Sequence, residues 1–387
     1  MRVGITIDKF IIGPGLPGID KVCYNLLLEL TNIGGIEVTL FQEKYKEVGE
    51  FGKFNVQRFF SLRDLPFAGR PMEGGTSMAG TNTFKPPPAF RLSIKDAIKR
   101  WTIERSGVDL LHYPTQLERP YRLHGISSVM TVHDLVPLIF RDMCTDRINW
   151  EMSESIKRLH RVDHFISVSN NTKKDMIEIL GIREDDISVV YSGVSSTYRP
   201  VDGGGMRDRV SGGKPYILFV GTVEPRKNLV TLLKAVAALE NDVSLVISGH
   251  MGWGYQDVKK TLEEKSLRER VRFTGYMRED QLPSLYSGAE LFVYPSWYEG
   301  FGLPPLEAMA CGTPVASSTG GSLPEILGDA AFYFDPADVE ALRHAIQQLL
   351  NSQDLRSRLV EKGLQRAGKF TWQNCASEVF DVYRKLI

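Results

Sequence analysis

The sequence has no excess of charge of either sign and no long apolar run. Its 387 residues include 47 Lys and Arg against 47 Asp and Glu, which gives a formal net charge of zero. Because a protein that binds nucleic acid non-specifically needs a basic surface, this balance argues against a nucleic-acid partner. No segment approaches the roughly 18 consecutive apolar residues of a membrane-spanning helix. The apolar N-terminus, residues 1–7, is too short for a signal peptide, so we interpret it as a strand and expect a cytoplasmic protein.

Cysteine is scarce, and metal-binding residue types do not cluster. The four cysteines form no C-x-x-C pair, which favours reduced, mostly buried thiols over disulfides. These cysteines are Cys23, Cys144, Cys311 and Cys375. The chain has no D-x-D pair, and no group of His and Cys has the spacing of a zinc site. We therefore expect neither a metal nor another cofactor.

What the sequence does contain is a regular alternation of strand-length apolar runs with segments of helical period. Such alternation predicts parallel sheets covered by helices on both faces. The predicted strands fall into two series: 2–7, 36–41, 108–113, 126–132, 163–168 and 187–190, then 216–221, 243–248, 270–274, 290–294, 313–317 and 331–334. The predicted fold class is therefore α/β, with two doubly wound domains.

The break between the two series is rich in glycine and proline. Residues 199–215 have no apolar period and the composition of a linker, so a first domain over 1–198 precedes a second one from 216. A second irregular stretch, 61–92, is too long for an ordinary connection. It is either a mobile functional loop or a disordered one.

A glycine motif near the N-terminus suggests a dinucleotide-binding dehydrogenase, but the position of the motif and its prolines argue against that function. Residues 13–18 fit G-x-G-x-x-G, but residues 8–12 separate the first glycine from its strand. Pro14 and Pro17 also remove two of the N–H groups that would hold a pyrophosphate. We expect a glycine-rich loop over a crevice between the domains, with a plain flexible turn as the alternative.

Residues 294–325 hold the densest group of special residues. A glycine turn over 299–302 leads into a helix that starts at the prolines 304–305 and ends near Cys311, before Gly312. Free amides at such a helix start bind anions. The flanking carboxylates of Glu299 and Glu307 would repel a phosphate, but they suit sugar hydroxyls. This pattern predicts a ligand with both phosphates and sugars, unless Glu299 only caps the turn and Glu307 is a solvated helix residue.

Other candidates follow predicted strands. Adjacent Arg226 and Lys227 open a predicted helix, where their charge opposes the helix dipole, which makes sense if both face a diphosphate rather than solvent. His133 ends a buried strand of the first domain and either contacts substrate or is structural. Residues 274–277 could offer backbone groups to a nucleotide base. Residues 248–250 also follow a predicted strand and are a second candidate for the same contact.

These motifs identify a resemblance that spans nearly the whole chain. The Glu299-x7-Glu307 pattern within residues 298–315, the segment Gly221-Thr-Val-Glu-Pro-Arg-Lys-Asn228 and two shorter motifs resemble the retaining glycosyltransferases of family 4. The shorter motifs are residues 190–194 and 370–372. Members of that family have the GT-B fold, in which two Rossmann-like domains face each other across a cleft. The resemblance implies that residues 216–370 bind the nucleotide-sugar, that 1–198 form the acceptor side, and that 371–387 pack back on the first domain.

The resemblance also implies a role for each candidate. Glu299 and His133 would contact the transferred hexose, Arg226 and Lys227 the diphosphate, and Glu307 the ribose diol. The remaining implied contacts are the amides of Phe301, Gly302 and Leu303 with sugar or phosphate, backbone at Tyr276 and Met277 with the base, and a loop from Gly15 to Gly18 that closes over the donor. Two positions depart from the family pattern. Thr222 stands where many relatives have Arg, and Gly18-Ile-Asp-Lys-Val22 replaces the commoner Gly-Ile-Gly-Arg-Tyr.

The implied reaction moves a hexose to a hydroxyl of a glycan or lipid-linked acceptor in polysaccharide assembly. The motifs resemble those of mannosyltransferases, so GDP-mannose is the first donor to expect. UDP-glucose, UDP-galactose and UDP-N-acetylglucosamine remain alternatives, as do a sugar phosphorylase or epimerase and a non-catalytic nucleotide-sugar-binding protein. Residues 91–105 form an amphipathic basic segment, which either packs on the protein or contacts the inner membrane face peripherally.

Overall fold

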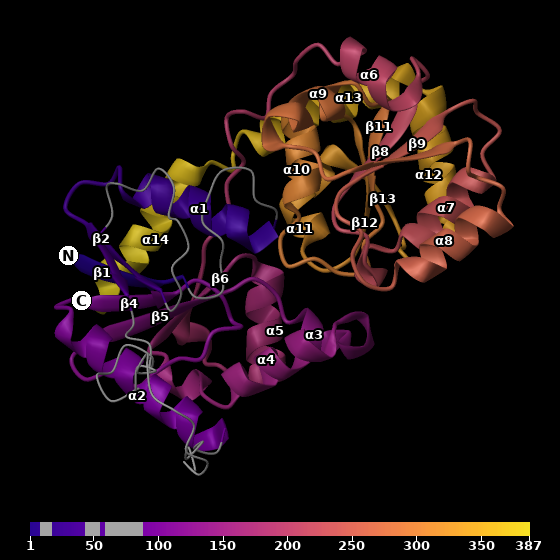
Figure 1. The fold of residues 1–387 in the computed structure, drawn as a ribbon. Coiled ribbons are helices and arrows are strands. Elements are labelled where there is room, and N and C mark those ends of the chain that lie inside the picture. The colour runs from indigo at the N-terminus through magenta and orange to yellow at the C-terminus, as the bar shows by residue number, and fades with distance from the viewer. Residues whose placement is uncertain (8–17, 43–54, 59–87) are drawn as a thin grey trace, which may run out of the picture.

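The computed structural model describes residues 1–7, 18–42, 55–58 and 88–387, which form two α/β lobes (Figure 1). The first lobe contains β1 (Arg2–Thr6), α1 (Gly18–Leu30), β2 (Glu37–Gln42), β3 (Asn55–Arg58), α2 (Pro88–Arg105), β4 (Leu110–Tyr113), β5 (Ser127–Val132), α3 (Val136–Ile139), α4 (Asp146–Ile156), β6 (His164–Ser167), α5 (Asn170–Leu180) and β7 (Ile187–Val189). Its strands form one parallel sheet in the order β3-β2-β1-β4-β5-β6-β7.

The second lobe repeats this plan. It contains α6 (Gly204–Ser211), β8 (Tyr216–Val220), α7 (Leu229–Ala237), β9 (Ser244–Ser248), α8 (Tyr255–Glu264), β10 (Val271–Gly275), α9 (Leu282–Ser287), β11 (Leu291–Tyr294), α10 (Leu303–Ala310), β12 (Val315–Ser318), α11 (Leu323–Leu327), β13 (Ala331–Phe334), α12 (Val339–Asn351) and α13 (Gln353–Ala367). Its parallel sheet has the order β10-β9-β8-β11-β12-β13. The predicted fold class of two doubly wound α/β units is confirmed, and β3 is a strand that the sequence pattern did not predict.

The strand order identifies where each lobe can bind a ligand. In a doubly wound sheet, ligands bind beyond the carboxyl ends of the strands at the point where the order reverses. That point lies between β1 and β4 in the first sheet and between β8 and β11 in the second. The two segments that the sequence singled out, 221–228 and 295–303, follow β8 and β11 and are therefore neighbours.

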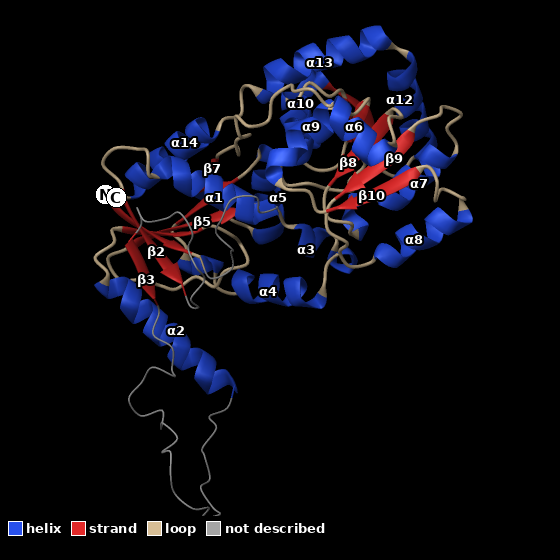
Figure 2. Cartoon of the chain, turned by 45° about the horizontal axis from the view of Figure 1, so that its top comes forward, coloured by secondary structure: helices blue, strands red, loops and turns tan. Residues whose placement is uncertain are grey.

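The central strands lack an alternation of apolar and polar residues, which explains why helices cover both faces of the sheet. In β8, the side chains of Tyr216, Ile217, Leu218 and Phe219 are all fully buried. A strand that is apolar on both sides requires a cover on both sides, and Figure 2 shows helices on both sides of the second sheet. Within the described ranges, no helix combines the length and the apolar character needed to cross a membrane.

The chain crosses between the lobes twice, and the two crossings touch. The last helix, α14 (Trp372–Leu386), returns to the first lobe and lies beside α1 (Figure 1). There Trp372 and Val379 share a core with residues of β1 and α1. Val194 N donates to Phe370 O at 2.9 Å, and a Cβ on Gly193 would lie 2.2 Å from Trp372 N. Only glycine therefore permits this close approach of the two crossings.

The range 199–215 differs from the predicted linker. It includes α6, and Val210 of that helix belongs to the buried core of the second lobe together with Tyr198. The glycines of this range concealed the helix from sequence analysis, because α6 contributes few apolar side chains to the core. The first crossing is thus anchored on the second lobe before β8 begins.

Helix α5 joins the first lobe to the second at its N-terminus. Ser169 caps the helix by accepting from Thr172 N, and its hydroxyl donates to Gly300 O at 2.7 Å. The carboxylate of Glu325 in α11 accepts from the backbone N–H groups of Asn170 and Asn171 at 2.7 and 2.9 Å. A carboxylate at a helix N-terminus is stabilised by the helix dipole, so this contact favours the closed arrangement of the lobes.

Candidate active site

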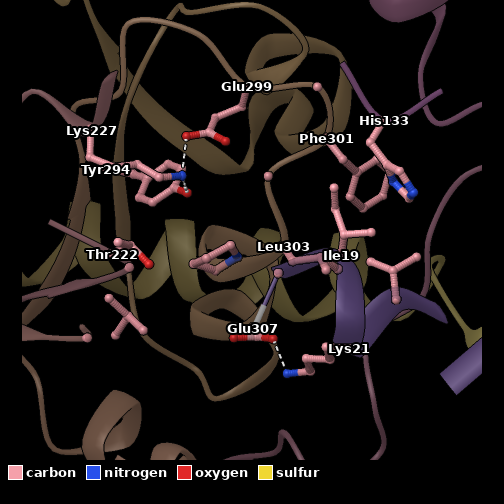
Figure 3. Close-up of a pocket in the computed structure, with 18 of the residues that line it drawn as sticks. Ile19, Lys21, His133, Thr222, Lys227, Tyr294, Glu299, Phe301, Leu303 and Glu307 are labelled. Carbon is pink, nitrogen blue, oxygen red and sulfur yellow. Dashed lines mark hydrogen bonds and ion pairs between the residues drawn. The ribbon is translucent and has the colours of Figure 1, made fainter. Parts of the chain in front are cut away.

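A cavity of about 340 Å³ lies between the lobes at the carboxyl ends of β8 and β11 (Figure 3). Its walls come from the start of α1, the segment after β5 and the loops after β8, β9, β10 and β11. The predicted site residues that line it are Gly18, His133, Arg226, Lys227, Tyr276, Met277, Glu299, Phe301, Gly302, Leu303 and Glu307. The structure thus brings these residues together, whereas Gly15 lies outside the described residues.

One end of the cavity is a buried ion cluster centred on Glu299. Its Oε1 accepts from Lys227 Nζ at 2.6 Å, and its Oε2 lies 2.7 Å from an Arg226 guanidinium nitrogen. Lys227 also donates to Tyr294 OH at 2.8 Å, and Arg226 donates to Glu224 Oε1 at 2.8 Å. We name Glu224, Arg226, Lys227, Tyr294 and Glu299 the Glu299 cluster. All five residues belong to the second lobe.

The charges of this cluster set its protonation. Burial raises the pKa of Glu299, but Arg226 and Lys227 outweigh it and lower that pKa to about 2. Burial and the adjacent Arg226 lower the pKa of Lys227, while Glu299 opposes them. Burial lowers the pKa of Arg226, but Glu299 and Glu224 raise it above its ordinary value. Glu299 is therefore an anion with both oxygens engaged, which makes it a weak base.

The backbone around Glu299 depends on glycines. Gly302 has a φ of 107° and precedes α10, and a Cβ on Gly300 would lie 1.8 Å from His133 O of the first lobe. On the other side, Ser322 N donates to Glu299 O at 2.9 Å. The turn is thus clamped between the lobes, and the predicted helix from 304 is present as α10, which begins at Leu303.

Arg226 and Lys227 do not open a helix as the sequence predicted. They lie in a 3₁₀ turn, Pro225–Lys227, and α7 begins only at Leu229. Asn228 separates the two elements with a φ of 57°, and its amide donates to Pro295 O and Pro336 O. The left-handed residue redirects the chain, so the two cations project toward Glu299 rather than along the axis of α7.

The other end of the cavity is a second buried network around Glu307, which we name the Glu307 cluster. Lys21 Nζ, from α1 of the first lobe, donates to Glu307 Oε1 at 2.5 Å and to Tyr198 OH at 2.7 Å, and lies 3.0 Å from Glu279 Oε1. Tyr286 OH donates to Glu307 Oε2 at 2.9 Å. Glu307 is 5% exposed, so its alternative interpretation as a solvated helix residue is wrong.

Sequence reasoning predicted Glu307 but missed Lys21, Tyr198, Glu279 and Tyr286. The signal was present, because Gly18-Ile-Asp-Lys-Val22 has Lys21 at the position of Arg in the commoner Gly-Ile-Gly-Arg-Tyr pattern. The pattern was interpreted only as a loop that closes over a ligand. Its cation reaches Glu307 across 286 positions of sequence, which no local pattern reveals.

His133 contributes a neutral imidazole from the first lobe. Its Nε2 lies 2.8 Å from Pro114 O, and because a carbonyl can only accept, Nε2 carries the proton. Burial lowers the pKa of His133, so the ring is uncharged near neutral pH. Nδ1 is then an acceptor, and Figure 3 shows the ring on the opposite side of the cavity from Lys227.

An aromatic pair forms part of the wall near β9 and β10. The rings of His250 and Tyr276 stack with centroids 4.6 Å apart and an angle of 12° between their planes. Gly249 permits a close approach of the loop after β9 to the loop after β8, because a Cβ there would lie 2.1 Å from Gly221 O. Tyr276 is 41% exposed, whereas Met277 is buried. In the part of the chain that the structure describes, no group of three or more His, Cys, Asp and Glu side chains is arranged to hold a metal ion.

Comparison with known proteins shows which family the chain resembles. The model of Glycosyl transferases group 1 matches residues 207–366, and that of Glycosyltransferase Family 4 matches residues 17–198. The O-antigen chain mannosyltransferase B of Escherichia coli is 34% identical over 308 residues, which cover 77% of this chain and 80% of that protein. The serotype-specific mannosyltransferase WbdA of Escherichia coli is 29% identical over 273 residues, which cover 67% of this chain and 34% of WbdA. The chain thus matches about a third of WbdA.

A solved structure supports the fold over its whole length. The crystal structure of HepE from Anabaena in complex with UDP and glucose has a TM-score of 0.76 and 17% identity, and the match covers 100% of each chain. Two doubly wound lobes with a cavity between the carboxyl ends of their strands define the class of GT-B glycosyltransferases. The chain belongs to glycosyltransferase family 4.

Proposed function

We propose that this glycosyltransferase moves a hexose from a nucleoside-diphosphate sugar to a hydroxyl of a glycan or lipid-linked acceptor, with retention of anomeric configuration. GDP-mannose is the proposed donor, because both Escherichia coli relatives are named mannosyltransferases. The observation that carries the proposal is that one cavity holds Arg226 and Lys227 at one end and the carboxylates of Glu279 and Glu307 at the other. A ligand that is part phosphate and part sugar matches both ends.

The Glu299 cluster is the proposed phosphate end. The acceptor oxygen bonds to C1 of the hexose as the bond from C1 to the diphosphate oxygen breaks, and the acceptor hydroxyl's proton passes to the leaving diphosphate. Negative charge develops on that diphosphate as the bond breaks. Arg226 and Lys227 are fixed in place before the reaction by Glu299, so their charge stabilises the diphosphate without reorganisation, and we propose that no metal is needed. The amides of Phe301, Gly302 and Leu303 at the start of α10 add donors for phosphate or sugar oxygens.

Glu299 acts through its charge in this proposal rather than as a base. Both of its oxygens bind cations, and its pKa of about 2 leaves it little tendency to accept a proton. Its negative charge next to the hexose counters the positive charge that develops at the sugar ring. His133 approaches the same sugar from the first lobe, where Nδ1 can accept a hydrogen bond from a hexose hydroxyl.

The Glu307 cluster is the proposed nucleoside end. A carboxylate accepts two hydrogen bonds from a vicinal diol, so Glu307 binds the ribose, while the base lies near Tyr276 and Met277. In this arrangement residues 216–370 bind the donor, and the first lobe, with residues 371–387 packed on it, presents the acceptor. Closure of the lobes excludes water and so limits hydrolysis of the donor.

Peripheral membrane contact through residues 91–105 is a separate part of the proposal. Trp101 of α2 is 51% exposed, and the Arg105 guanidinium lies 4.6 Å from its ring centroid. An exposed aromatic ring beside a cation suits an anionic leaflet that holds a lipid-linked acceptor. We expect flotation with anionic liposomes to decrease in Trp101→Ser and to stay unchanged in the control Lys260→Ser on the second lobe. Equal flotation of all three proteins would remove membrane contact through α2 from the proposal.

A donor panel tests the function itself. Radiolabelled GDP-mannose, UDP-glucose, UDP-galactose and UDP-N-acetylglucosamine are each incubated with the protein, and both sugar transfer to lipid-linked glycan acceptors and donor hydrolysis are counted. We expect turnover with GDP-mannose, unaffected by EDTA. Turnover with a UDP-sugar alone would replace the donor, and binding without any turnover would identify a non-catalytic nucleotide-sugar-binding protein.

A further inference from the structure

Lys21 is the cationic side chain that the first lobe contributes to the described lining of the cavity. It is 9% exposed, and its Nζ has an acceptor for each of its three N–H groups, in Glu307, Tyr198 and Glu279. Glu279 and Glu307 belong to the second lobe, and Tyr198 ends the crossing into it. The buried ammonium has a hydrogen-bond acceptor for each of its N–H groups, and these acceptors belong to the other lobe or to the crossing into it. The contact is therefore a specific one between the lobes rather than an incidental surface ion pair.

The charges around Lys21 explain why it matters for Glu307. Two carboxylate oxygens lie within 3.0 Å of one nitrogen, and Lys21 is the cation that both share. Burial lowers the pKa of Lys21, but Glu307 and Glu279 raise it above its ordinary value, so the ammonium stays charged. Without that cation the two carboxylates would repel each other, and Glu307 would turn away from its present position.

The contacts of Glu307 leave room for a ligand. Lys21 occupies one lone pair on Oε1, and Tyr286 OH occupies one on Oε2. Each carboxylate oxygen can accept a second hydrogen bond, and Glu307 lines the cavity. A pair of vicinal hydroxyls can therefore bind while Lys21 stays in place.

We propose that Lys21 is a positioning residue of the donor site, which orients the Glu307 carboxylate toward the ribose hydroxyls of the nucleotide. This inference rests on the proposed function of the cavity as a nucleotide-sugar site. Because Lys21 comes from the first lobe and Glu307 from the second, the ribose contact is complete only when the lobes are closed. Recognition of the sugar of the nucleotide is thus linked to closure of the lobes.

The experiment compares ribonucleotide with deoxyribonucleotide. GDP, UDP and their 2′-deoxy forms are titrated by calorimetry into the wild type, Lys21→Met, Lys21→Arg and the control Lys260→Met, an exposed lysine of α8. A hydrogen bond to a charged group contributes enough to give wild type and control a preference for the ribonucleotide of about ten- to hundredfold. We expect Lys21→Met to lose most of that preference and Lys21→Arg to keep most of it.

A second variant guards against a folding defect. Lys21→Met with Glu279→Gln has one unpaired carboxylate fewer, so the repulsion on Glu307 is removed and at least part of the ribose preference returns. If Lys21→Met retains the wild-type ratio, or if the double variant recovers none of it while melting like the wild type, Lys21 has no role in positioning Glu307. Failure of the wild type to bind either GDP or UDP would instead reject the proposed function.

Discussion

The two ends of the cavity are built in different ways, although each contains a buried glutamate held by a lysine. In the Glu299 cluster every member comes from the second lobe, and Arg226, Lys227 and Glu299 follow adjacent strands. In the Glu307 cluster the lysine comes from the first lobe. The proposed phosphate end is therefore organised by one sheet alone, whereas the proposed nucleoside end is completed only by contact between the lobes.

This difference separates two demands on a glycosyl-transfer site. Stabilising a leaving diphosphate requires charges that do not move during the reaction, which a rigid sheet edge supplies. Admitting and releasing a nucleotide requires a contact that can open, which an interface between lobes supplies. The predictions below test whether the two ends behave as differently as their construction implies.

The largest effect is expected from removal of the phosphate-end cation in Lys227→Met. Loss of a fixed charge that stabilises the transition state reduces kcat/KM by about 10²- to 10³-fold. Radiolabelled sugar transfer measures it, with the exposed Lys260→Met as the matched control. Turnover at the wild-type rate in Lys227→Met would remove Lys227 from the mechanism.

A smaller effect is expected at the nucleoside end in Glu307→Gln. The substitution keeps the shape but removes the charge that receives the ribose hydroxyls, so nucleotide affinity falls by about ten- to hundredfold while kcat changes less. Calorimetry and steady-state kinetics separate the two parameters. The control is Glu290→Gln, which removes an ion pair with Arg207 away from the cavity. A loss confined to kcat would show that Glu307 does not act through nucleotide binding.

The pH dependence of the free energy of unfolding tests the ion pairing in the Glu299 cluster. The pKa of Glu299 is lowered from 4.5 to about 2, so its ionised form stabilises the fold above pH 4.5, and this contribution is lost as pH falls toward 2. The free energy of unfolding of the wild type, measured relative to Glu299→Gln, therefore falls by about 1 kcal/mol between pH 6 and pH 4. Urea unfolding of both proteins at these pH values measures it. A difference that is independent of pH contradicts the tight ion pairing.

The smallest effect concerns the contact between the lobes at α5. Glu325→Gln removes the negative charge at the N-terminus of that helix, which lowers the free energy of unfolding by about 0.3–1 kcal/mol. Because this contact favours closure, nucleotide affinity falls slightly in the same variant. Glu361→Gln, at an exposed position in the middle of α13, is the control for loss of charge alone. Equal stability of Glu325→Gln and wild type would show that this contact does not hold the lobes together.

The comparison of the two ends also explains what the sequence could predict. The Glu299 cluster follows from local patterns, because Arg226 and Lys227 come after one buried strand and Glu299 after the strand that pairs with it. Parallel strands end at the same edge of a sheet, so each segment was expected at a strand end, and the family resemblance assigned both to one ligand. The structure adds that β8 and β11 are neighbours. The twelve predicted strands and the helix after Gly302 were found by the same reasoning, since apolar period and glycine turns are local properties.

What depends on contacts distant in sequence was missed. Lys21 meets Glu307 only because α1 lies across the cavity from α10, and the sequence gives no sign of that pairing beyond the basic residue itself. Helix α6 was assigned to a linker because glycines mask its single buried side chain, Val210. The 3₁₀ turn at Arg226 and Lys227 depends on Asn228 in a left-handed conformation, which the hydrogen bonds of its side-chain amide to Pro295 O and Pro336 O stabilise.

The most direct test of the donor site is a calorimetric titration of GDP-mannose into wild type, Lys227→Met and Glu307→Gln under identical conditions. We predict that the wild type binds GDP-mannose and that each variant binds it at least tenfold more weakly, because one substitution removes a phosphate contact and the other a ribose contact. Equal affinity in all three proteins would contradict the assignment of this cavity as the nucleotide-sugar site.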